Sequence, residues 1–495
     1  MKKHLALFFA LLMLTLPVLA ACGESNDVSE EVSKQVSETV SEDENVFPLE
    51  KKFFDTTVTI LTRSGRFSQQ FVPDEEYEGS AINAAVEARN QYIEENYGIT
   101  IEIEKSTNPI VDIEASITTN TDNYDVVCDN VYSMIQRTTD NWFYTLNDIL
   151  ELDRPWWDQN ANNMLTLSDK VFYVAGDAIF ADDLFTAGVF YNKSVWAERY
   201  ENLYGSLYDM VDNGTWTYDI MLELAKDFSQ PDEDGLWMTD GCYYGIVTDG
   251  YTGATMLTNG SGAVSAYKDE QNNIVLSGGS EASVKAFDKV YTMLNDTTVS
   301  LYAEQYNPTN WGAPGNYFNG GHALFQVGYI SVLLGIMELE SADKVNPGVL
   351  PIPKYNKEQE DYHCGINVYQ SNVLALPVSN QKNLEATAYA LELLGYYSTR
   401  ESSFGKNCVT DAFYETSLKL QSVTDDNDSR MLDLITSSRI YDLGGAFNWG
   451  GNLIGLYSSN LYRGSNTLIS TWEADFSKIE QAMLDTLDAY QNSIS

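Results

Sequence analysis

The fold is decided by three pieces of sequence: TVTIL (57–61), SAINAAVEARNQYI (80–93) and GITIEIE (98–104). The first and last pieces alternate apolar and polar residues, which is the period of a half-buried β-strand. Between them, apolar residues recur at helical spacing after Ser80, a residue type that favours helix N-caps, and Gly98 predicts the end of that helix. Strand, helix and strand in this order predict an α/β fold.

The same patterns continue along the chain. Residues 124–128 read as a short buried strand, and residues 323–337 as strand, turn and helix, because Gln326, Gly328 and Ser331 break an apolar run. A hairpin is expected over residues 263–276, where asparagines tolerate the positive φ of a tight turn. Apolar stripes predict two long amphipathic helices, which are expected at 386–397 and 476–494.

The N-terminus reads as a signal peptide over residues 1–21. Lys2 and Lys3 precede an apolar run, Leu5 to Leu19, that is too short to span a bilayer. The run ends in Leu19-Ala20-Ala21-Cys22, which resembles a bacterial lipobox, and the resemblance implies lipidation of Cys22. The alternative is an ordinary secretory signal with a chance cysteine.

The net charge of the chain excludes some classes of binding partner. With 29 basic and 72 acidic residues the net charge is −43, so nucleic acid and anionic lipid surfaces would be repelled. Residues 22–52 are rich in Ser, Glu and Asp and poor in apolar residues, which predicts a disordered acidic tether. The rest of the chain is long enough for two folded lobes.

The four remaining cysteines carry no metal or redox signature. Cys128, Cys242, Cys364 and Cys408 allow three disulfide pairings, but they form no CxxC motif and no metal-ligand spacing. Buried or incidental thiols are expected, with no metal and no cofactor.

Several segments resemble, in order, the extracellular solute-binding proteins of ABC sugar importers, the family with a maltose-binding-protein-like fold. Each motif is short, and the resemblance rests on their order and spacing from residue 53 to 495. The segments are Val58-Thr59-Ile60, Ala88-Arg89-Asn90, Tyr97-Gly98-Ile99, Tyr124-Asp125-Val126-Val127, Leu146-Asn147-Asp148, Phe190-Tyr191-Asn192-Lys193, Trp216-Thr217-Tyr218-Asp219, Phe318-Asn319-Gly320-Gly321-His322-Ala323-Leu324-Phe325 and Val349-Leu350-Pro351-Ile352-Pro353. Tyr218 and Tyr329 stand where the family commonly has Trp, so no particular sugar specificity is carried over.

The resemblance implies an α/β protein of two lobes, the type II periplasmic-binding-protein-like fold. Each lobe would be a mixed sheet flanked by helices, with the ligand cleft between lobes that close by hinge motion. The expected boundaries are 53–177 with 365–430 for lobe 1, and 178–364 with 431–495 for lobe 2.

The implied function is that of a lipid-anchored protein on the extracytoplasmic face of the cell membrane. It would bind a carbohydrate, expected to be an oligosaccharide, and deliver it to ABC importer permease subunits, acting as a monomer and not as an enzyme. A surface receptor that binds a sugar or another polar solute and signals through a partner would have the same sequence features.

Candidate ligand contacts follow from the chemistry of sugars, which need aromatic faces and polar side chains in a concave site. Aromatic residues in loops rich in Gly and Asn are the candidates for stacking: Trp311, Tyr329 and Trp449. Ligands of open α/β sheets bind beyond the carboxyl ends of strands, which nominates four polar residues: Arg63, Ser64, Asp129 and Asn130. For each the alternative is structural: packing for the rings, helix capping for Asp129 or Asn130, and a solvated ion pair for Arg63.

Two rival function classes, a surface enzyme and a metal-dependent or sensory binding protein, lack supporting motifs. After removal of the signal peptide the histidines are His322 and His363, and the sequence contains no HExxH, GxSxG or GxxxxGK, so a surface glycoside hydrolase or other enzyme has no recognised constellation. The acidic runs at 232–235 and 425–428 lack the Gly and Glu positions of a calcium loop. Solvated loops explain them.

Overall fold

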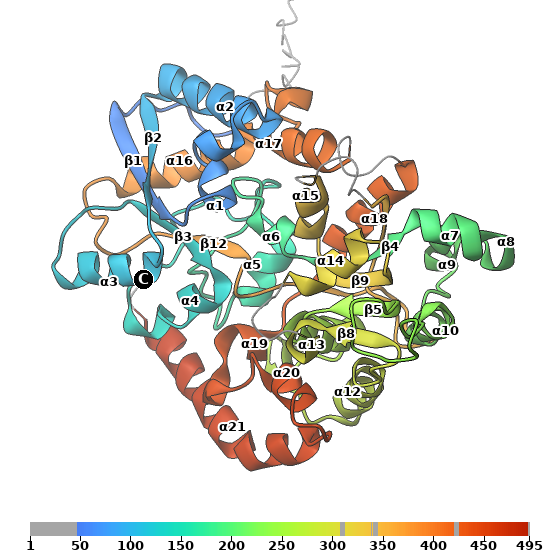
Figure 1. The fold of residues 1–495 in the computed structure, drawn as a ribbon. Helices are drawn as coiled ribbons and strands as arrows, with labels where there is room; N and C mark the ends of the chain where they lie inside the picture. Colours follow the sequence, from blue (N-terminus) through green and yellow to red (C-terminus); the bar gives the residue numbers. More distant parts are fainter. Residues whose placement is uncertain (1–46, 307–311, 338, 340–344, 420–424, 494–495) are drawn as a thin grey trace, which may run out of the picture. The chain divides into compact units, whose positions relative to one another are not determined.

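The computed structural model describes residues 47–306, 312–337, 339, 345–419 and 425–493 (Figure 1). Its strands form two larger sheets and two two-stranded ones. The predicted signal peptide, Cys22 and Trp311 lie outside the described residues.

The first sheet contains the two strands predicted at residues 57–61 and 98–104. Its strands, in spatial order, are β12 (Asn372–Ala375), β3 (Val126–Asn130), β1 (Thr56–Thr62) and β2 (Ile99–Lys105). β1 runs parallel to β2 and β3, with Ile60 opposite Ile103 and Val126, and β12 runs antiparallel to β3. All five residues of β3 are buried, and its first three, Val126 to Cys128, form an apolar run rather than an alternation.

Helix α2 (Ala81–Tyr97) joins β1 to β2, as the sequence predicted. The Ser80 side chain accepts a hydrogen bond from the Asn83 amide, and Gly98 ends the helix in the left-handed conformation at φ 67°. Helix α16 (Leu384–Tyr397) packs against α2 and β1. The other helices of this part are α1 (Arg66–Gln69), α3 (Pro109–Thr118), α4 (Val131–Ile135), α5 (Gln159–Leu165), α6 (Ala181–Leu184) and α17 (Val409–Asp411).

The second sheet is mixed as well. Its strands, in spatial order, are β10 (Pro347–Leu350), β4 (Ala187–Asn192), β9 (Ala323–Tyr329), β5 (Tyr244–Thr248) and β8 (Ser300–Tyr302). β9 is antiparallel to β4 and parallel to β5, and α10 (Tyr218–Phe228) and α14 (Ala313–Asn319) pack on β5 and β9. The other described helices between these strands are α7 (Lys193–Arg199), α8 (Glu201–Tyr204), α9 (Leu207–Asp212), α11 (Leu257–Gly260), α12 (Glu281–Leu294), α13 (Ala303–Tyr306) and α15 (Ser331–Met337).

The chain crosses between the two sheets more than once. It leaves the first sheet after β3, enters the second at β4, and returns after β10 to form β12. The crossing segments pair with each other, because β11 (Cys364–Gly365) runs beside β13 (Arg439–Ile440) and Thr186 bridges to Ile366. The strands of the first sheet are therefore discontinuous in sequence, whereas those of the second sheet all lie within residues 187–350.

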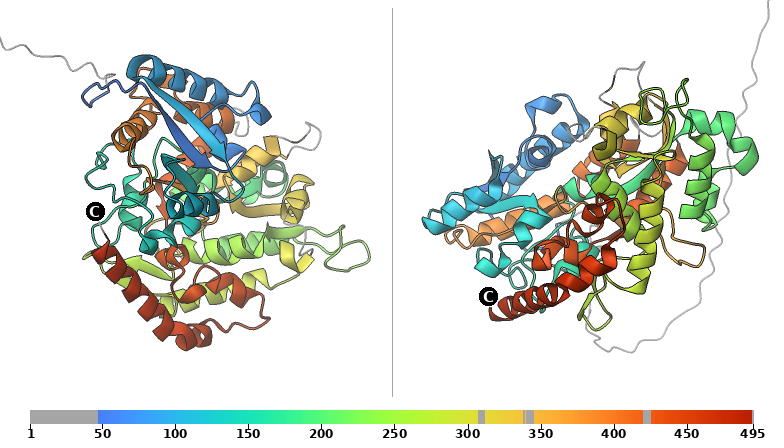
Figure 2. Two further views of the ribbon diagram at one scale, coloured as in Figure 1. Left: turned by 90° about the vertical axis from the view of Figure 1, so that its left-hand side faces the viewer. Right: turned by 60° about the horizontal axis from the view of Figure 1, so that its bottom comes forward.

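The C-terminal part is mostly helical. It contains α18 (Asp426–Ser437), α19 (Leu443–Phe447), α20 (Leu456–Leu461) and α21 (Leu468–Asn492), the long red helix of Figure 2. α21 begins eight residues before the predicted helix at 476. Among the described residues, no helix combines the length and apolar character that a membrane crossing needs.

The packed body includes residues that the sequence assigned to the tether. Phe47 is buried, and its ring lies among those of Tyr97, Trp156, Tyr389 and Tyr396. The prediction of a tether to residue 52 therefore runs six residues too far, because one aromatic residue is enough to anchor the end of an acidic segment in a core. The hairpin was predicted correctly in place, and its two strands are β6 (Ala266–Lys268) and β7 (Ile274–Leu276), with Asn272 at φ 62°.

Candidate functional site

Arg63 directly follows β1, and its side chain contacts residues of two neighbouring strands of the first sheet, β3 and β12. Its Nε lies 3.0 Å from Oδ1 of Asp129, and its Nη2 donates to Oδ1 of Asn372 at 3.2 Å. The guanidinium also lies 4.2 Å from the centroid of the Phe67 ring. Burial raises the pKa of Asp129, while the Arg63 charge opposes that shift. The two residues therefore form a mostly buried ion pair at the carboxyl end of the sheet.

The structure places Asp129 and Asn130 inside β3, whereas the sequence predicted a strand that ends at Cys128. The Asn130 side chain accepts a hydrogen bond from the Ser133 amide and caps α4, so the helix-cap alternative holds for this residue. Oδ1 of Asp129 also accepts from the Asn130 amide at 2.7 Å. Ser64, the fourth polar candidate, is exposed. Arg63, Asp129 and Asn130 thus lie close together, and Asp129 contacts both of the others.

Aromatic rings continue from this ion pair to the second sheet. Phe67 stacks on Phe185 with 6.0 Å between ring centroids and 17° between planes, and Phe185 meets Tyr329 edge-on at 6.3 Å. Tyr329 is the last residue of β9, and Phe185 precedes β4 on the crossing segment. Oγ1 of Thr252 donates to the Tyr329 hydroxyl at 2.9 Å, and burial raises the pKa of that hydroxyl.

A second row of aromatic rings also runs from the first sheet to the second. The ring centroid of Tyr132, in α4, lies 5.1 Å from that of Tyr369. The Tyr369 centroid lies 5.6 Å from that of Tyr251, which follows β5. Tyr369 is 40% exposed, so one ring of the row faces solvent. We call both rows and the ion pair the strand-end cluster, which comprises Arg63, Phe67, Asp129, Tyr132, Phe185, Tyr251, Tyr329 and Tyr369.

Sequence reasoning missed most of these rings. Tyr132 and Tyr251 follow β3 and β5 within a few residues, which is the signal that nominated Arg63 and could have nominated them. Phe67, Phe185 and Tyr369 have no such local signal, because two of them belong to crossing segments and Phe67 belongs to a short helix.

The predicted stacking residue Trp449 lies elsewhere. Its indole is 2% exposed, stacks on Phe447 at 5.0 Å and donates from Nε1 to Thr486 of α21 at 3.0 Å. This is the environment of a packing residue, which was the alternative for each ring. Of the three predicted rings, the structure brings Tyr329 into the strand-end cluster.

The cysteines and acidic residues give no sign of a metal centre. All four described cysteines are buried free thiols, and burial raises the pKa of Cys128 to about 12. Within the described ranges, no group of three or more His, Cys, Asp or Glu side chains is arranged to hold a metal ion.

No protein-family model and no curated protein sequence matches the chain, but many solved structures do. The ABC substrate-binding protein Lmo0181 from Listeria monocytogenes, in complex with cycloalternan, gives a TM-score of 0.55 at 12% identity over 86% of this chain and 99% of that chain. The apo-form of RafE from Streptococcus pneumoniae gives 0.55 at 14% identity over 86% and 98%. A cyclo/maltodextrin-binding protein complexed with maltotetraose gives 0.55 at 14% identity over 90% and 98%.

These structures share the fold over nearly their whole length. Two mixed sheets flanked by helices and joined by crossing segments, the first of them discontinuous in sequence, form the type II periplasmic-binding-protein-like fold. The fold class predicted from the sequence is thereby confirmed.

Proposed function

We propose that the protein is a lipid-anchored, extracytoplasmic solute-binding protein that binds a carbohydrate at the strand-end cluster and delivers it to an ABC importer. The observation that carries the proposal is the convergence of rings from both sheets beside a buried Arg63–Asp129 pair. Flat rings suit the C–H face of a pyranose, and amide or charged groups suit its hydroxyls.

The structural neighbours support the same ligand class. Their ligands include cycloalternan and maltotetraose, which are neutral oligosaccharides. For this chain we propose lobe boundaries near 177, 364 and 430, with hinge closure over the ligand. The strand-end position agrees with the general rule that ligands of open α/β sheets bind beyond the carboxyl ends of strands.

The test is calorimetry with the purified protein and a panel of neutral oligosaccharides that includes maltotetraose and raffinose. We expect a saturable heat for at least one of them, and at 100 times its Kd that sugar should stabilise the protein by about 2.7 kcal/mol. Tyr369→Ala should weaken binding roughly tenfold to a hundredfold, as truncated hot-spot rings do.

Tyr204→Ala is the matched control for the ring. Tyr204 is 37% exposed, close to the value for Tyr369, and it lies in α8 outside the cluster. Its removal should leave affinity unchanged. Equal losses in the two variants, or wild-type affinity in Tyr369→Ala, would mean that the sugar binds elsewhere.

The lipid anchor is tested separately. The Leu19-Ala20-Ala21-Cys22 spacing motivates it, and Cys22→Ala should move the protein from the detergent phase to the aqueous phase in phase separation. A variant that still partitions with detergent would contradict anchoring at Cys22.

A further inference from the structure

A large cavity is lined by described residues none of which belongs to the strand-end cluster. Its volume is about 910 Å³, and its walls come from the segment before α5, from the end of α16 through α17, and from the end of α18 through β13. A recess of about 200 Å³ adjoins it and shares Asp158, Asp177, Asp183, Thr410 and Arg439 with its lining. We call this smaller space the Arg439 recess.

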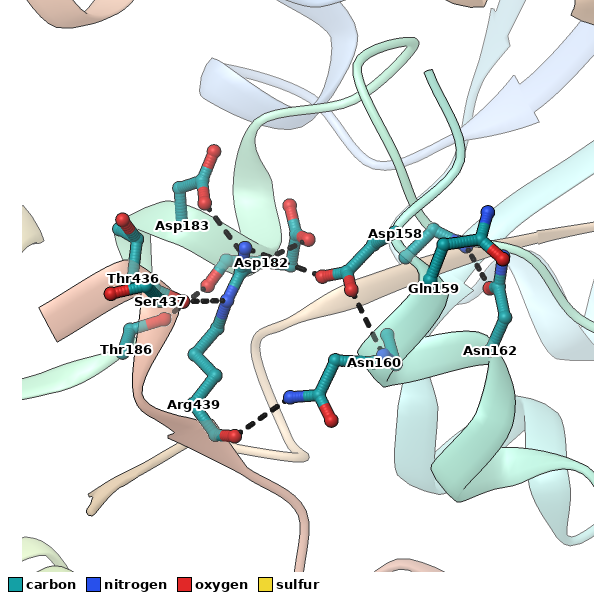
Figure 3. Close-up of polar contacts among 12 residues, drawn as sticks. Asp158, Gln159, Asn160, Asn162, Asp182, Asp183, Thr186, Thr436, Ser437 and Arg439 are labelled. Atoms are coloured by element: carbon teal, nitrogen blue, oxygen red, sulfur yellow. Dashed lines mark hydrogen bonds and ion pairs between the residues drawn. The ribbon is translucent and has the colours of Figure 1, made fainter. Parts of the chain in front are cut away.

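Arg439 holds a group of carboxylates around the recess (Figure 3). Its Nη1 lies 2.8 Å from Oδ2 of Asp182 and 3.1 Å from Oδ1 of Asp183, and its Nη2 lies 3.3 Å from Oδ2 of Asp158. Asp177 lines the same space. Three carboxylates therefore contact one guanidinium and a fourth lines the same recess, so the formal charges do not balance within it.

Two of these carboxylates have hydrogen-bonding capacity to spare. Asp182 is 3% exposed and lines the recess, and its Oδ1 has no hydrogen-bond partner among the described residues. Asp177 accepts a hydrogen bond from Oγ1 of Thr410 at 3.1 Å, and burial raises its pKa to about 7. A buried acceptor without a donor is costly, so a donor supplied by a ligand would be bound favourably.

The outer cavity offers a different surface. Trp156 and Tyr396 line it, with their rings edge-to-face at 5.6 Å, and Tyr414 lines both spaces. Aromatic walls accept the carbon skeleton of a small organic molecule and also attract a cation.

We infer that the cavity is a second binding site, which takes a small organic cation with an ammonium group against Asp182 and Asp177. An ammonium supplies positive charge and three N–H donors, and charge-assisted hydrogen bonds are stronger than neutral ones. A linear amine longer than the recess would extend along Trp156 and Tyr396. This site goes beyond the proposed carbohydrate function and does not depend on it.

The test uses spermidine and putrescine as probes, with 1,4-butanediol as an uncharged probe of similar length, in 0.3 M salt to suppress unspecific attraction to an acidic protein. Calorimetry on the purified protein should show saturable binding of an amine and none of the diol. Asp182→Asn and Asp177→Asn should each weaken amine binding about tenfold or more, because each removes a charged acceptor.

Glu401→Gln is the matched control, since Glu401 lines the outer cavity, is exposed, and loses the same charge. It should change amine affinity less than threefold. Tyr369→Ala should leave amine binding intact, which separates this site from the carbohydrate site.

No saturable amine binding by the folded wild-type protein would overturn the proposal. So would wild-type affinity in either Asn variant, or an equal loss in Glu401→Gln. Circular dichroism establishes that each variant is folded, and if Asp182→Asn does not fold, Asp177→Asn decides alone.

Discussion

The strand-end cluster and the Arg439 recess both place an arginine among buried acids, but they balance charge differently. At the strand ends Arg63 pairs with one carboxylate, Asp129, and rings supply most of the remaining surface. In the recess Arg439 faces Asp158, Asp182 and Asp183, with Asp177 beside them. A balanced, aromatic surface suits a neutral ligand, whereas an excess of carboxylates suits a cation or protons.

Removal of Arg439 should give the largest effect. Arg439→Met leaves several buried carboxylates without their counter-charge, and breaking a buried ion pair costs about 3 to 5 kcal/mol. Urea denaturation at pH 8 measures the loss in the free energy of unfolding. The control is Arg430→Met, because Arg430 and Asp212 form an ion pair with side chains about half exposed, which is worth about 0 to 1 kcal/mol. Similar losses in both variants would mean that the recess carries no special charge balance.

Trp449→Ala should destabilise the protein nearly as much as Arg439→Met and should leave its affinity for the oligosaccharide unchanged. Deleting a buried Trp costs about 3 to 5 kcal/mol of stability, and the indole packs on Phe447 and α21. Urea denaturation and calorimetry with the best oligosaccharide give the two readouts. A variant of wild-type stability with weakened sugar binding would place Trp449 at the ligand instead.

Because of Asp177, the free energy of unfolding of the wild-type protein should fall more steeply with rising pH than that of Asp177→Asn. Its folded pKa, about 7, lies above the unfolded value near 3.8, so its stabilising contribution is complete below about pH 4 and is lost as the pH rises through 7. Asp177→Asn should remove up to about 1.4 kcal/mol per pH unit of slope in that window, measured by urea denaturation at several pH values. The exposed Asp153→Asn is the control, and an unchanged slope in Asp177→Asn would show that the carboxylate is solvated.

The smallest effect is expected at the hydroxyl of Tyr329. Tyr329→Phe loses the hydrogen bond from Thr252 and should cost about 0.5 to 1.5 kcal/mol of stability while keeping the ring. Thr252→Val should cost a similar amount. In the double variant the losses should be less than additive, since both changes remove one bond, and full additivity would show that the two groups act independently.

Local chemistry made part of the fold predictable. β1, α2 and β2 were found because alternation, the Ser80 cap and the Gly98 stop all lie within a few residues of the elements they define. Arg63 was nominated because it follows a strand, and the structure places it in the strand-end cluster. The end of β3 was placed two residues early, since Asp129 and Asn130 are polar but are still paired in the sheet.

Trp449 shows why the aromatic site was harder to predict. Asn448-Trp449-Gly450-Gly451-Asn452 has the composition of an exposed loop, and Gly450 and Gly451 do have positive φ. Those glycines, however, let the backbone turn so that the indole packs against α21. Composition predicted the turn but not the side on which the ring would lie.

The sequence by itself determined the α/β character of the chain, the lipobox-like N-terminus and the acidic character, because each depends on the order or composition of neighbouring residues. The two-lobed architecture was expected from the resemblance to a known family and not from local patterns. The tertiary structure alone decided which rings meet. Tyr132 comes from a helix, Tyr369 from a crossing segment and Tyr251 from the helical turn after β5, and Arg439 meets Asp158 and Asp182 across hundreds of residues. Such neighbours are set by sheet pairing and by the path of the crossing segments, and no local periodicity encodes either.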